Sequence, residues 1–455
     1  MTRSLTAYHP RPKGGATAPF TLGTALLAAS LLLASCGGPS APPATTPGTG
    51  TNTAGRAALS VTASTPVLTT NLNAPTQLRV AGVAPADVTV QVTGAPESLT
   101  VKVGAGVADG AATVLPLTVT GTAPEGTAVQ MNVTAGGRAA SLTLPVTAFE
   151  RVIIPASSGE AYAASSIGTG RGGQLTLVAS PNGAASAEAR HSLLHFDPAA
   201  RTLTAQAVNI AQDQETILSH AVTPDGTGWV SVSATSARGV SLINLRTQQT
   251  FRPGVPDLPS RLNVTPDGSL WFMAPSVSAL VRLNPAGTIT RVPMDPGAEW
   301  LTAGADGRLY LGRSGAAPAI LALDPVSGEQ NTYPVTLVRQ SQPGNLTAAP
   351  DGTLWFIEGT TSTVVHLDPR TQKQTPLTLP GTDPRPSRLA ALPDGTVWVM
   401  DGREKVLHRV QGGRVTLTLP LPRDPAGQVL VPDALGGTAD SRLVFTAGGA
   451  LYLQQ

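Results

Sequence analysis

The sequence contains little of several residue types that proteins use for covalent or electrostatic function. Cys36 is the single cysteine in 455 residues, so no disulfide can form within the chain. Only 13% of the residues are charged, 30 basic against 28 acidic, and the basic residues form no cluster. Because a nucleic-acid-binding surface needs concentrated positive charge, the composition predicts no nucleic acid among the partners.

The sequence also lacks the common catalytic motifs. It has no Gly-x-Ser-x-Gly elbow for a serine nucleophile, no Cys/His pair, no His-Glu-x-x-His zinc motif and no glycine-rich loop that could hold a phosphate. The enzyme classes that depend on these motifs are therefore disfavoured. The repeats and the order of segments along the chain are the remaining indications of function.

The second half of the chain repeats one short phrase five times. Each copy is a turn that ends in Asp-Gly, and two residues separate it from an aromatic residue. The turn aspartates are Asp225, Asp267, Asp306, Asp351 and Asp394, and the aromatic residues are Trp229, Trp271, Tyr310, Trp355 and Trp398. The aspartates are 39 to 45 residues apart, the length of one four-stranded propeller blade. Because the aromatic residues recur beside apolar neighbours, they are predicted to fill the core rather than bind a ligand.

Each repeat predicts strands joined by tight turns. Apolar residues alternate on both sides of Asp-Gly, as in strands, and the glycine can take the positive φ that a hairpin needs. Weaker copies at residues 170–209 and around Asp440 bring the number of units to seven. The last unit lacks its outer strand, and residues 151–155 are predicted to supply it by pairing with the C-terminal strand. The predicted fold class is all-β: a seven-bladed β-propeller at residues 150–455 whose N-terminal strand closes the last blade and removes exposed edges.

The N-terminus has the pattern of a bacterial lipoprotein. Three basic residues precede an apolar run at residues 20–33 that is short for a membrane span, and Leu33-Ala34-Ser35-Cys36 follows. These four residues resemble the lipobox, so residues 1–35 are predicted to be a signal peptide, Cys36 the lipidated residue and the cell envelope the location. A secretory signal with a chance cysteine and an uncleaved anchor are the alternatives. Residues 1–35 hold three basic and no acidic residues, so the remainder carries a net charge of about −1.

Two further segments precede the repeats. Residues 36–56 consist mainly of Gly, Pro, Ser, Thr and Ala, so a flexible linker is predicted. Residues 57–148 contain short alternating runs with Gly, Pro, Asp or Asn turns every 8 to 15 residues, which predicts a β-sandwich. This block resembles the immunoglobulin-like modules that act as stalks on bacterial surface proteins, and a spacer is favoured over a binding module.

Two of the repeats carry a phrase that is typical of one propeller family. Residues 343–358 read Pro-Gly-Asn-Leu-Thr-Ala-Ala-Pro-Asp-Gly-Thr-Leu-Trp-Phe-Ile-Glu, and residues 386–401 read Pro-Ser-Arg-Leu-Ala-Ala-Leu-Pro-Asp-Gly-Thr-Val-Trp-Val-Met-Asp. Both resemble the repeat of the virginiamycin B (streptogramin B) lyase superfamily, a set of seven-bladed propellers close to the NHL group. The resemblance extends over most of residues 211–400.

The resemblance implies a metal-dependent elimination carried by histidines and glutamates, with Mg²⁺ as cofactor. The family's histidine slot lies seven residues before the turn aspartate, and no blade of this sequence has a histidine there. His220 lies five residues before Asp225, where other blades carry leucine, so it is expected to be a packed strand residue. Glu358 matches the glutamate that ends the family's phrase. His220 and Glu358 are therefore weak catalytic candidates, and no metal ligand is predicted.

The mouth of the central channel is the predicted binding site. The residue six positions before each turn aspartate is next to the position that usually holds leucine, so its side chain lies on the opposite face of the innermost strand. From there it can reach the mouth of the channel. Glu299 is added because it neighbours Trp300, and Asp401 because it occupies the position that Glu358 has in the preceding blade. The predicted binding residues are Arg261, Glu299, Trp300, Asn345, Arg388 and Asp401. Two arginines and a tryptophan at one rim suit a polar or anionic small molecule. Scattered solvated residues without a ligand are the alternative.

Two functions are compatible with these features. The first is a lipid-anchored extracytoplasmic propeller that binds a ligand or an envelope protein, or acts as a scaffold, and needs no cofactor. The alternative is a streptogramin B lyase-like, metal-dependent C–O lyase that uses Mg²⁺ and opens a ring without hydrolysis. The empty histidine slots favour the first function.

Overall fold

The computed structural model of the chain describes residues 59–154, 162–169, 173–181, 192–207, 215–234, 240–257, 261–336 and 342–455. The predicted signal peptide, the linker and Cys36 lie outside these residues. The described residues belong to one compact unit, Thr45–Gln455. They form strands with short 3₁₀ turns, and none of their helical segments is long and apolar enough to cross a membrane.

The first nine strands form two sheets. One sheet has the order β1-β3-β7-β5, with β6 also paired to β7, and the other has the order β2-β9-β8-β4. Pairing is antiparallel except between β2 and β9. The strands are β1 (Val61–Ala63), β2 (Leu68–Thr69), β3 (Thr76–Ala81), β4 (Val88–Thr93), β5 (Leu99–Val103), β6 (Val107–Asp109), β7 (Ala112–Gly121), β8 (Ala128–Ala135) and β9 (Arg138–Thr147).

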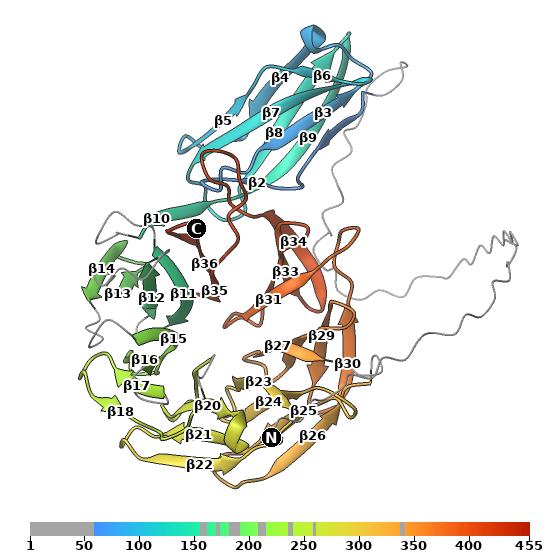
Figure 1. The fold of residues 1–455 in the computed structure, drawn as a ribbon. Helices are drawn as coiled ribbons and strands as arrows, with labels where there is room; N and C mark the ends of the chain where they lie inside the picture. Colours follow the sequence, from blue (N-terminus) through green and yellow to red (C-terminus); the bar gives the residue numbers. More distant parts are fainter. Residues whose placement is uncertain are drawn as a thin grey trace, which may run out of the picture. The chain divides into compact units, whose positions relative to one another are not determined.

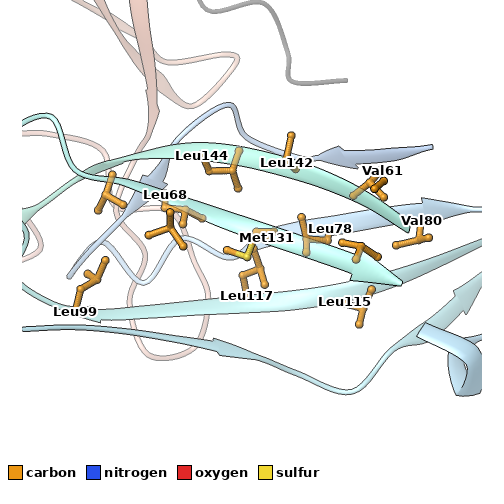
Figure 2. Packing of buried hydrophobic residues seen from close by; sticks show 14 of the residues in the cluster. Val61, Leu68, Leu78, Val80, Leu99, Leu115, Leu117, Met131, Leu142 and Leu144 are labelled. Carbon is orange, nitrogen blue, oxygen red and sulfur yellow. The ribbon is translucent and has the colours of Figure 1, made fainter. Parts of the chain in front are cut away.

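Side chains of both sheets form one apolar core (Figure 2). In β3, Leu78 and Val80 are buried while their neighbours are exposed, and Val129, Met131 and Val133 follow the same alternation in β8. A period of two places one face of each strand in the core. Residues 59–147 are thus a β-sandwich, and their likeness to immunoglobulin-like modules stays a prediction.

The described part of residues 149–455 contains seven four-stranded antiparallel sheets. The first sheet consists of β11 (Tyr162–Thr169), β12 (Leu175–Pro181), β13 (Ser192–Asp197) and β14 (Thr202–Ala207). The second consists of β15 (Glu215–Val222), β16 (Gly228–Ala234), β17 (Val240–Asn244) and β18 (Thr250–Phe251). The third consists of β19 (Asn263–Val264), β20 (Leu270–Ala274), β21 (Ala279–Leu283) and β22 (Ile289–Pro293).

The next three sheets are β23 (Ala298–Ala303), β24 (Leu309–Arg313), β25 (Ala319–Leu323) and β26 (Gln330–Pro334); β27 (Pro343–Ala348), β28 (Leu354–Glu358), β29 (Thr363–Asp368) and β30 (Lys373–Leu377); and β31 (Pro386–Ala391), β32 (Val397–Asp401), β33 (Val406–Gln411) and β34 (Arg414–Pro420). The last sheet joins β35 (Ala434–Gly437), β36 (Leu443–Ala447) and β37 (Ala450–Gln454) to β10 (Phe149–Ile153).

The seven sheets close into a ring (Figure 1). The first strand of each sheet contacts the first strand of the next, in the order β11, β15, β19, β23, β27, β31 and β35, and β35 contacts β11 in turn. The sheets are therefore arranged as the blades of a propeller, with these strands innermost.

β10 completes the last blade from the N-terminal side. It pairs antiparallel with β37, with Arg151 opposite Tyr452 and Ile153 opposite Ala450. This is the strand pairing that the sequence predicted for residues 151–155. Phe149, at the start of β10, is fully buried and meets the ring of Phe445 edge-on, with centroids 5.7 Å apart.

The repeated Asp-Gly turns have the predicted geometry. In all five, the aspartate accepts a hydrogen bond from the backbone N–H two residues later, at 2.9 to 3.1 Å. The five glycines have φ between 81° and 84°, a conformation that other residues adopt only at a cost. The five aromatic residues that follow are between 1% and 9% exposed, so they fill the core as predicted.

Candidate functional site

A cavity of about 380 Å³ lies at the centre of the ring. Its walls are the innermost strands and the residues just before them, and each of the seven sheets contributes to the lining. The polar part of the lining is Ser219, His220, Arg261, Asn263, Thr302, Asn345, Thr347 and Arg388. Small-molecule sites are concave and have volumes of roughly 300 to 1,000 Å³. This central cavity is therefore the candidate site.

β-Bulges occur where several innermost strands reach the cavity. The register shifts lie between Ile217 and Ser219 in β15, Ala298 and Trp300 in β23, Gly344 and Thr347 in β27, and Pro386 and Arg388 in β31. A bulge interrupts the alternation of a strand and re-aims a side chain. The slot six residues before the turn aspartate lies at each of these bulges, and Ser219, Asn345 and Arg388 in this slot line the cavity.

Arg261 is held in place by two neighbours from other blades. Its guanidinium lies 4.6 Å from the centre of the Trp300 ring, within range of a cation–π interaction. Its Nη2 donates a hydrogen bond to Oδ1 of Asn345 at 3.2 Å. Arg261 is exposed to solvent, but the protein atoms packed around it lower its pKa, and the nearby charge of Arg388 lowers this pKa further. The charged guanidinium is therefore destabilised, although arginine stays protonated.

Trp300 supports this arrangement from β23. A Cβ atom at Gly344 would come within 2.9 Å of Nε1 of Trp300, so only glycine leaves room for the indole against β27. Next to Gly344, Asn345 has a φ of 46°, within the bulge of this strand. Trp300 itself is not part of the cavity lining, and the structure places it behind Arg261.

Arg388 is the second cationic group of the cavity. Among the described residues, its guanidinium has no hydrogen-bond or salt-bridge partner. Asp433, which precedes β35, is close enough to feel its charge: burial raises the pKa of Asp433, and Arg388 opposes this increase. The charges of Arg261 and Arg388 therefore repel each other, and no carboxylate of the described residues forms a salt bridge with either.

Two further polar residues face the cavity. Nδ2 of Asn263 is buried and has no hydrogen-bond partner among the described residues. His220 is 5% exposed and lies in β15, in the slot that holds leucine in other blades. It packs as a strand residue as predicted, and it is one of the lining residues.

Of the six predicted binding residues, Glu299, Trp300 and Asp401 do not line the cavity. Glu299 is exposed in the bulge of β23 and accepts a hydrogen bond from Ser314 Oγ at 3.0 Å. The extra residue of this bulge turns Glu299 away from the channel while Trp300 faces Arg261. Asp401 is fully buried and accepts hydrogen bonds from three backbone N–H groups, those of Arg385, Arg403 and Glu404, at 2.9 to 3.0 Å.

Glu358 has the same role in the preceding blade. It ends β28, is fully buried and is not part of the cavity lining. Its carboxylate accepts hydrogen bonds from the N–H groups of Gln342, Thr360 and Thr361 at 2.7 to 3.0 Å and from the Thr361 hydroxyl at 2.6 Å. Burial raises the pKa of Glu358, but these hydrogen bonds together lower it more, to about 2. Glu358 is therefore an acceptor that fixes two loops, and it does not meet His220 in the cavity.

The Mg²⁺ ion that the lyase resemblance implies does not fit these residues. Mg²⁺ prefers oxygen ligands, chiefly carboxylates. The lining of the central cavity contains no carboxylate, and within the described ranges no three His, Cys, Asp or Glu side chains gather at one place. Both oxygens of Glu358 already accept hydrogen bonds from neighbouring loops. No step through a metal is therefore derived.

Comparison with known proteins gives a consistent picture of the fold. Residues 253–447 match the model of the virginiamycin B lyase family. A streptogramin B lyase structure aligns with 68% of this chain and 97% of its own, at 16% identity and a TM-score of 0.52. Virginiamycin B lyase from Staphylococcus aureus aligns with 68% of this chain and 98% of its own, at 15% identity and a TM-score of 0.50. A catalytically inactive variant of that enzyme with quinupristin aligns over 68% and 99%, at 15% identity and a TM-score of 0.51.

No curated protein matches the chain. At these identities the likeness to solved structures concerns the fold, while the family match rests on the repeats of residues 253–447. The ring of four-stranded sheets, its Asp-Gly turns and this match agree with one another. The described part of residues 149–455 thus forms a propeller, and residues 253–447 are similar to the virginiamycin B lyase family.

Proposed function

We propose that this protein is a lipid-anchored, extracytoplasmic binding propeller whose central cavity takes a polar or anionic small molecule. The observation that carries the proposal is the lining of the cavity. It presents the guanidiniums of Arg261 and Arg388 and the amide of Asn263, and none of the three has a carboxylate partner among the described residues. Such donors in a concave site are suited to binding acceptors of a ligand.

The same lining is poorly suited to a metal-dependent elimination. That reaction needs ligands for a cation and a base that removes a proton. Glu358 has a low pKa and accepts hydrogen bonds from its own loops, so it is a weak base, and the family's histidine slot holds no histidine. A binding or scaffold role requires neither metal ligands nor a catalytic base at the site.

The family match over residues 253–447 is the observation that favours the alternative, a streptogramin B lyase-like activity. Incubation of the purified protein with quinupristin and Mg²⁺ separates the two functions. Because ring opening by elimination gives a linear isomer of equal mass, the product is to be separated by liquid chromatography and identified by tandem mass spectrometry. We expect intact quinupristin. Linear product that disappears when EDTA is added would show a lyase and sink the binding proposal.

The anchor is tested by Cys36→Ser. We expect this variant to leave the membrane fraction with an unchanged melting temperature, because a diacylglyceryl group anchors stably while a protein without a lipid has no comparable attachment. The measurement is fractionation of cells followed by immunoblotting. Incorporation of labelled palmitate into the wild-type protein, and its loss in Cys36→Ser, is the positive control. A Cys36→Ser protein that stays in the membrane fraction would contradict the proposed anchor.

In this proposal the β-sandwich is a spacer. Residues 36–56 and the sandwich would separate the propeller from the membrane, so a ligand or an envelope protein could reach the ring from the surroundings. The scaffold role and an envelope partner belong to this proposal, and both are compatible with a cavity that binds a small molecule.

A further inference from the structure

The central cavity has a more specific chemistry than a general polar site. Resting on the proposed binding function, we infer that the cavity binds a small oxyanion of charge −2, free or carried as an ester group, between the guanidiniums of Arg261 and Arg388. Phosphate and phosphate monoesters share this chemistry. The inference concerns the ligand class and the two residues that recognise it.

The first support is that the cavity brings two cations together without anions. Arg261 and Arg388 come from blades on different sides of the ring, and both line the same cavity. Arg388 lowers the pKa of Arg261, so the two charges are close enough to repel each other. Neither forms a salt bridge in the part of the chain that the structure describes. An isolated protein gains nothing from such repulsion, whereas a bound anion removes it.

The second support is that Arg261 is already oriented. The Trp300 ring lies against one face of its guanidinium, and Asn345 accepts a hydrogen bond from Nη2. A guanidinium that is held in this way loses little rotamer freedom when it binds a ligand. Its remaining N–H groups form the planar fork that binds two oxygens of a carboxylate or phosphate at once.

The third support is the excess of donors over acceptors around the two arginines. Nδ2 of Asn263 is buried without an acceptor, beside Arg261 in the lining. A buried donor without a partner is costly, and turning this amide toward a ligand oxygen would remove the cost. An oxyanion with three or four oxygens can accept from both guanidiniums and from this amide, while a neutral sugar offers each arginine only a weaker neutral acceptor.

The charge of the ligand follows from the balance of nearby groups. Two guanidiniums face the cavity, and Asp433, whose carboxylate interacts with Arg388, lies outside the lining and forms no salt bridge with it. A dianion neutralises both arginines, whereas a monoanion leaves one unbalanced. Removing the charge of Asp433 should therefore strengthen the binding of an anion, because Arg388 would lose a competing attraction.

The test is isothermal titration calorimetry of the full chain with sodium sulfate and sodium phosphate in a chloride-free buffer of low ionic strength. We expect Arg261→Gln and Arg388→Gln each to weaken binding at least about tenfold, which is the typical effect of losing a charge-assisted hydrogen bond. The double variant should not bind. Arg261→Lys keeps the charge but not the fork, so it should retain part of the affinity, and Asp433→Asn should bind more tightly than the wild type.

Arg414→Gln is the matched control. Arg414 is exposed at the start of β34, outside the cavity lining, so this variant should bind both anions like the wild type. Thermal melts are to be recorded for every variant, so that a loss of binding by a folded variant is told apart from unfolding. Equal binding by the wild type and the double variant, or no binding of either anion by a folded wild type at millimolar concentration, overturns the inference.

Two further ligands show whether the anion is free phosphate or a phosphate ester. They also show whether a negative result contradicts only this inference or the proposed binding function as well. Glycerol 3-phosphate binding more tightly than inorganic phosphate indicates a phosphate ester, and the reverse indicates the free ion. Glycerol is the neutral counterpart and should not bind. A cavity that binds a neutral sugar but no anion contradicts this inference and leaves the binding function in place, whereas turnover of quinupristin contradicts the binding function whatever the anions do.

Discussion

A chain that begins at residue 155 is expected not to fold cooperatively, whereas one that begins at residue 149 folds and melts in a single transition. The two differ only by β10 and Ile154. β10 pairs along its whole length with β37, and without it the last strand has an open edge in place of a partner. Phe149 is fully buried against Phe445, and Ile154 is 4% exposed in the apolar cluster that joins the last blade to the first.

The expected loss is large compared with the stability of a domain. Removing a buried phenylalanine costs about 3 to 5 kcal/mol, and leaving a buried isoleucine out costs about 1.5 to 3 kcal/mol. Their sum is comparable to the total stability of a typical domain, about 5 to 15 kcal/mol. Both fragments lack the hydrogen bond from Phe149 N–H to Thr70 Oγ1, so their difference isolates β10 and Ile154. Equal melting temperatures of the two fragments would mean that the ring closes without β10.

Glu358→Gln is expected to destabilise the propeller by about 2 to 4 kcal/mol, because the amide leaves several buried N–H donors facing a weaker or mismatched acceptor. The measurement is the free energy of unfolding at neutral pH. Glu299→Gln is the matched control: Glu299 is exposed with one hydrogen bond, so its loss should cost no more than about 0.5 kcal/mol. If Glu358→Gln kept full stability, the carboxylate would not be fixing these loops, and a catalytic role would regain support.

The destabilisation by Glu358→Gln should depend on pH. The folded state lowers the pKa of Glu358 from 4.5 to about 2, so its contribution is complete above the unfolded value and disappears as the pH falls through the folded value. The difference in unfolding free energy between wild type and variant should therefore be constant near neutral pH and shrink between pH values of about 5 and 2. A difference that grew on acidification would contradict the low pKa.

The local chemistry of the repeats was readable in the sequence because each feature is contained in a few neighbouring residues. Asp225 and Gly226 determine their turn by themselves, and Trp229 recurs with apolar neighbours that mark a buried strand. The pairing of β10 could be predicted because one unit lacked a strand.

The candidate site was predictable only in part because its residues come from different blades. The slot of Arg261, Asn345 and Arg388 does reach the cavity, but the bulges at Asn345 and Arg388 are backbone features with no sequence signal in this chain. Glu299 and Asp401 were expected at the channel mouth but do not line the cavity. In a sequence, a carboxylate near a strand end that faces a channel cannot be distinguished from one that accepts hydrogen bonds from its own loops. Asn263 was missed because an unsatisfied amide becomes visible only once its neighbours are placed.

The central claim is that the cavity at the centre of the ring binds an oxyanion between two arginines. Crystals of the protein soaked in selenate, an analogue of sulfate with a strong anomalous signal, test it most directly. The predicted result is an anomalous peak within hydrogen-bond distance of both Arg261 and Arg388, absent in crystals of the Arg261→Gln/Arg388→Gln double variant. A well-ordered cavity without a peak at saturating selenate, or a peak that persists in the double variant, would contradict the claim.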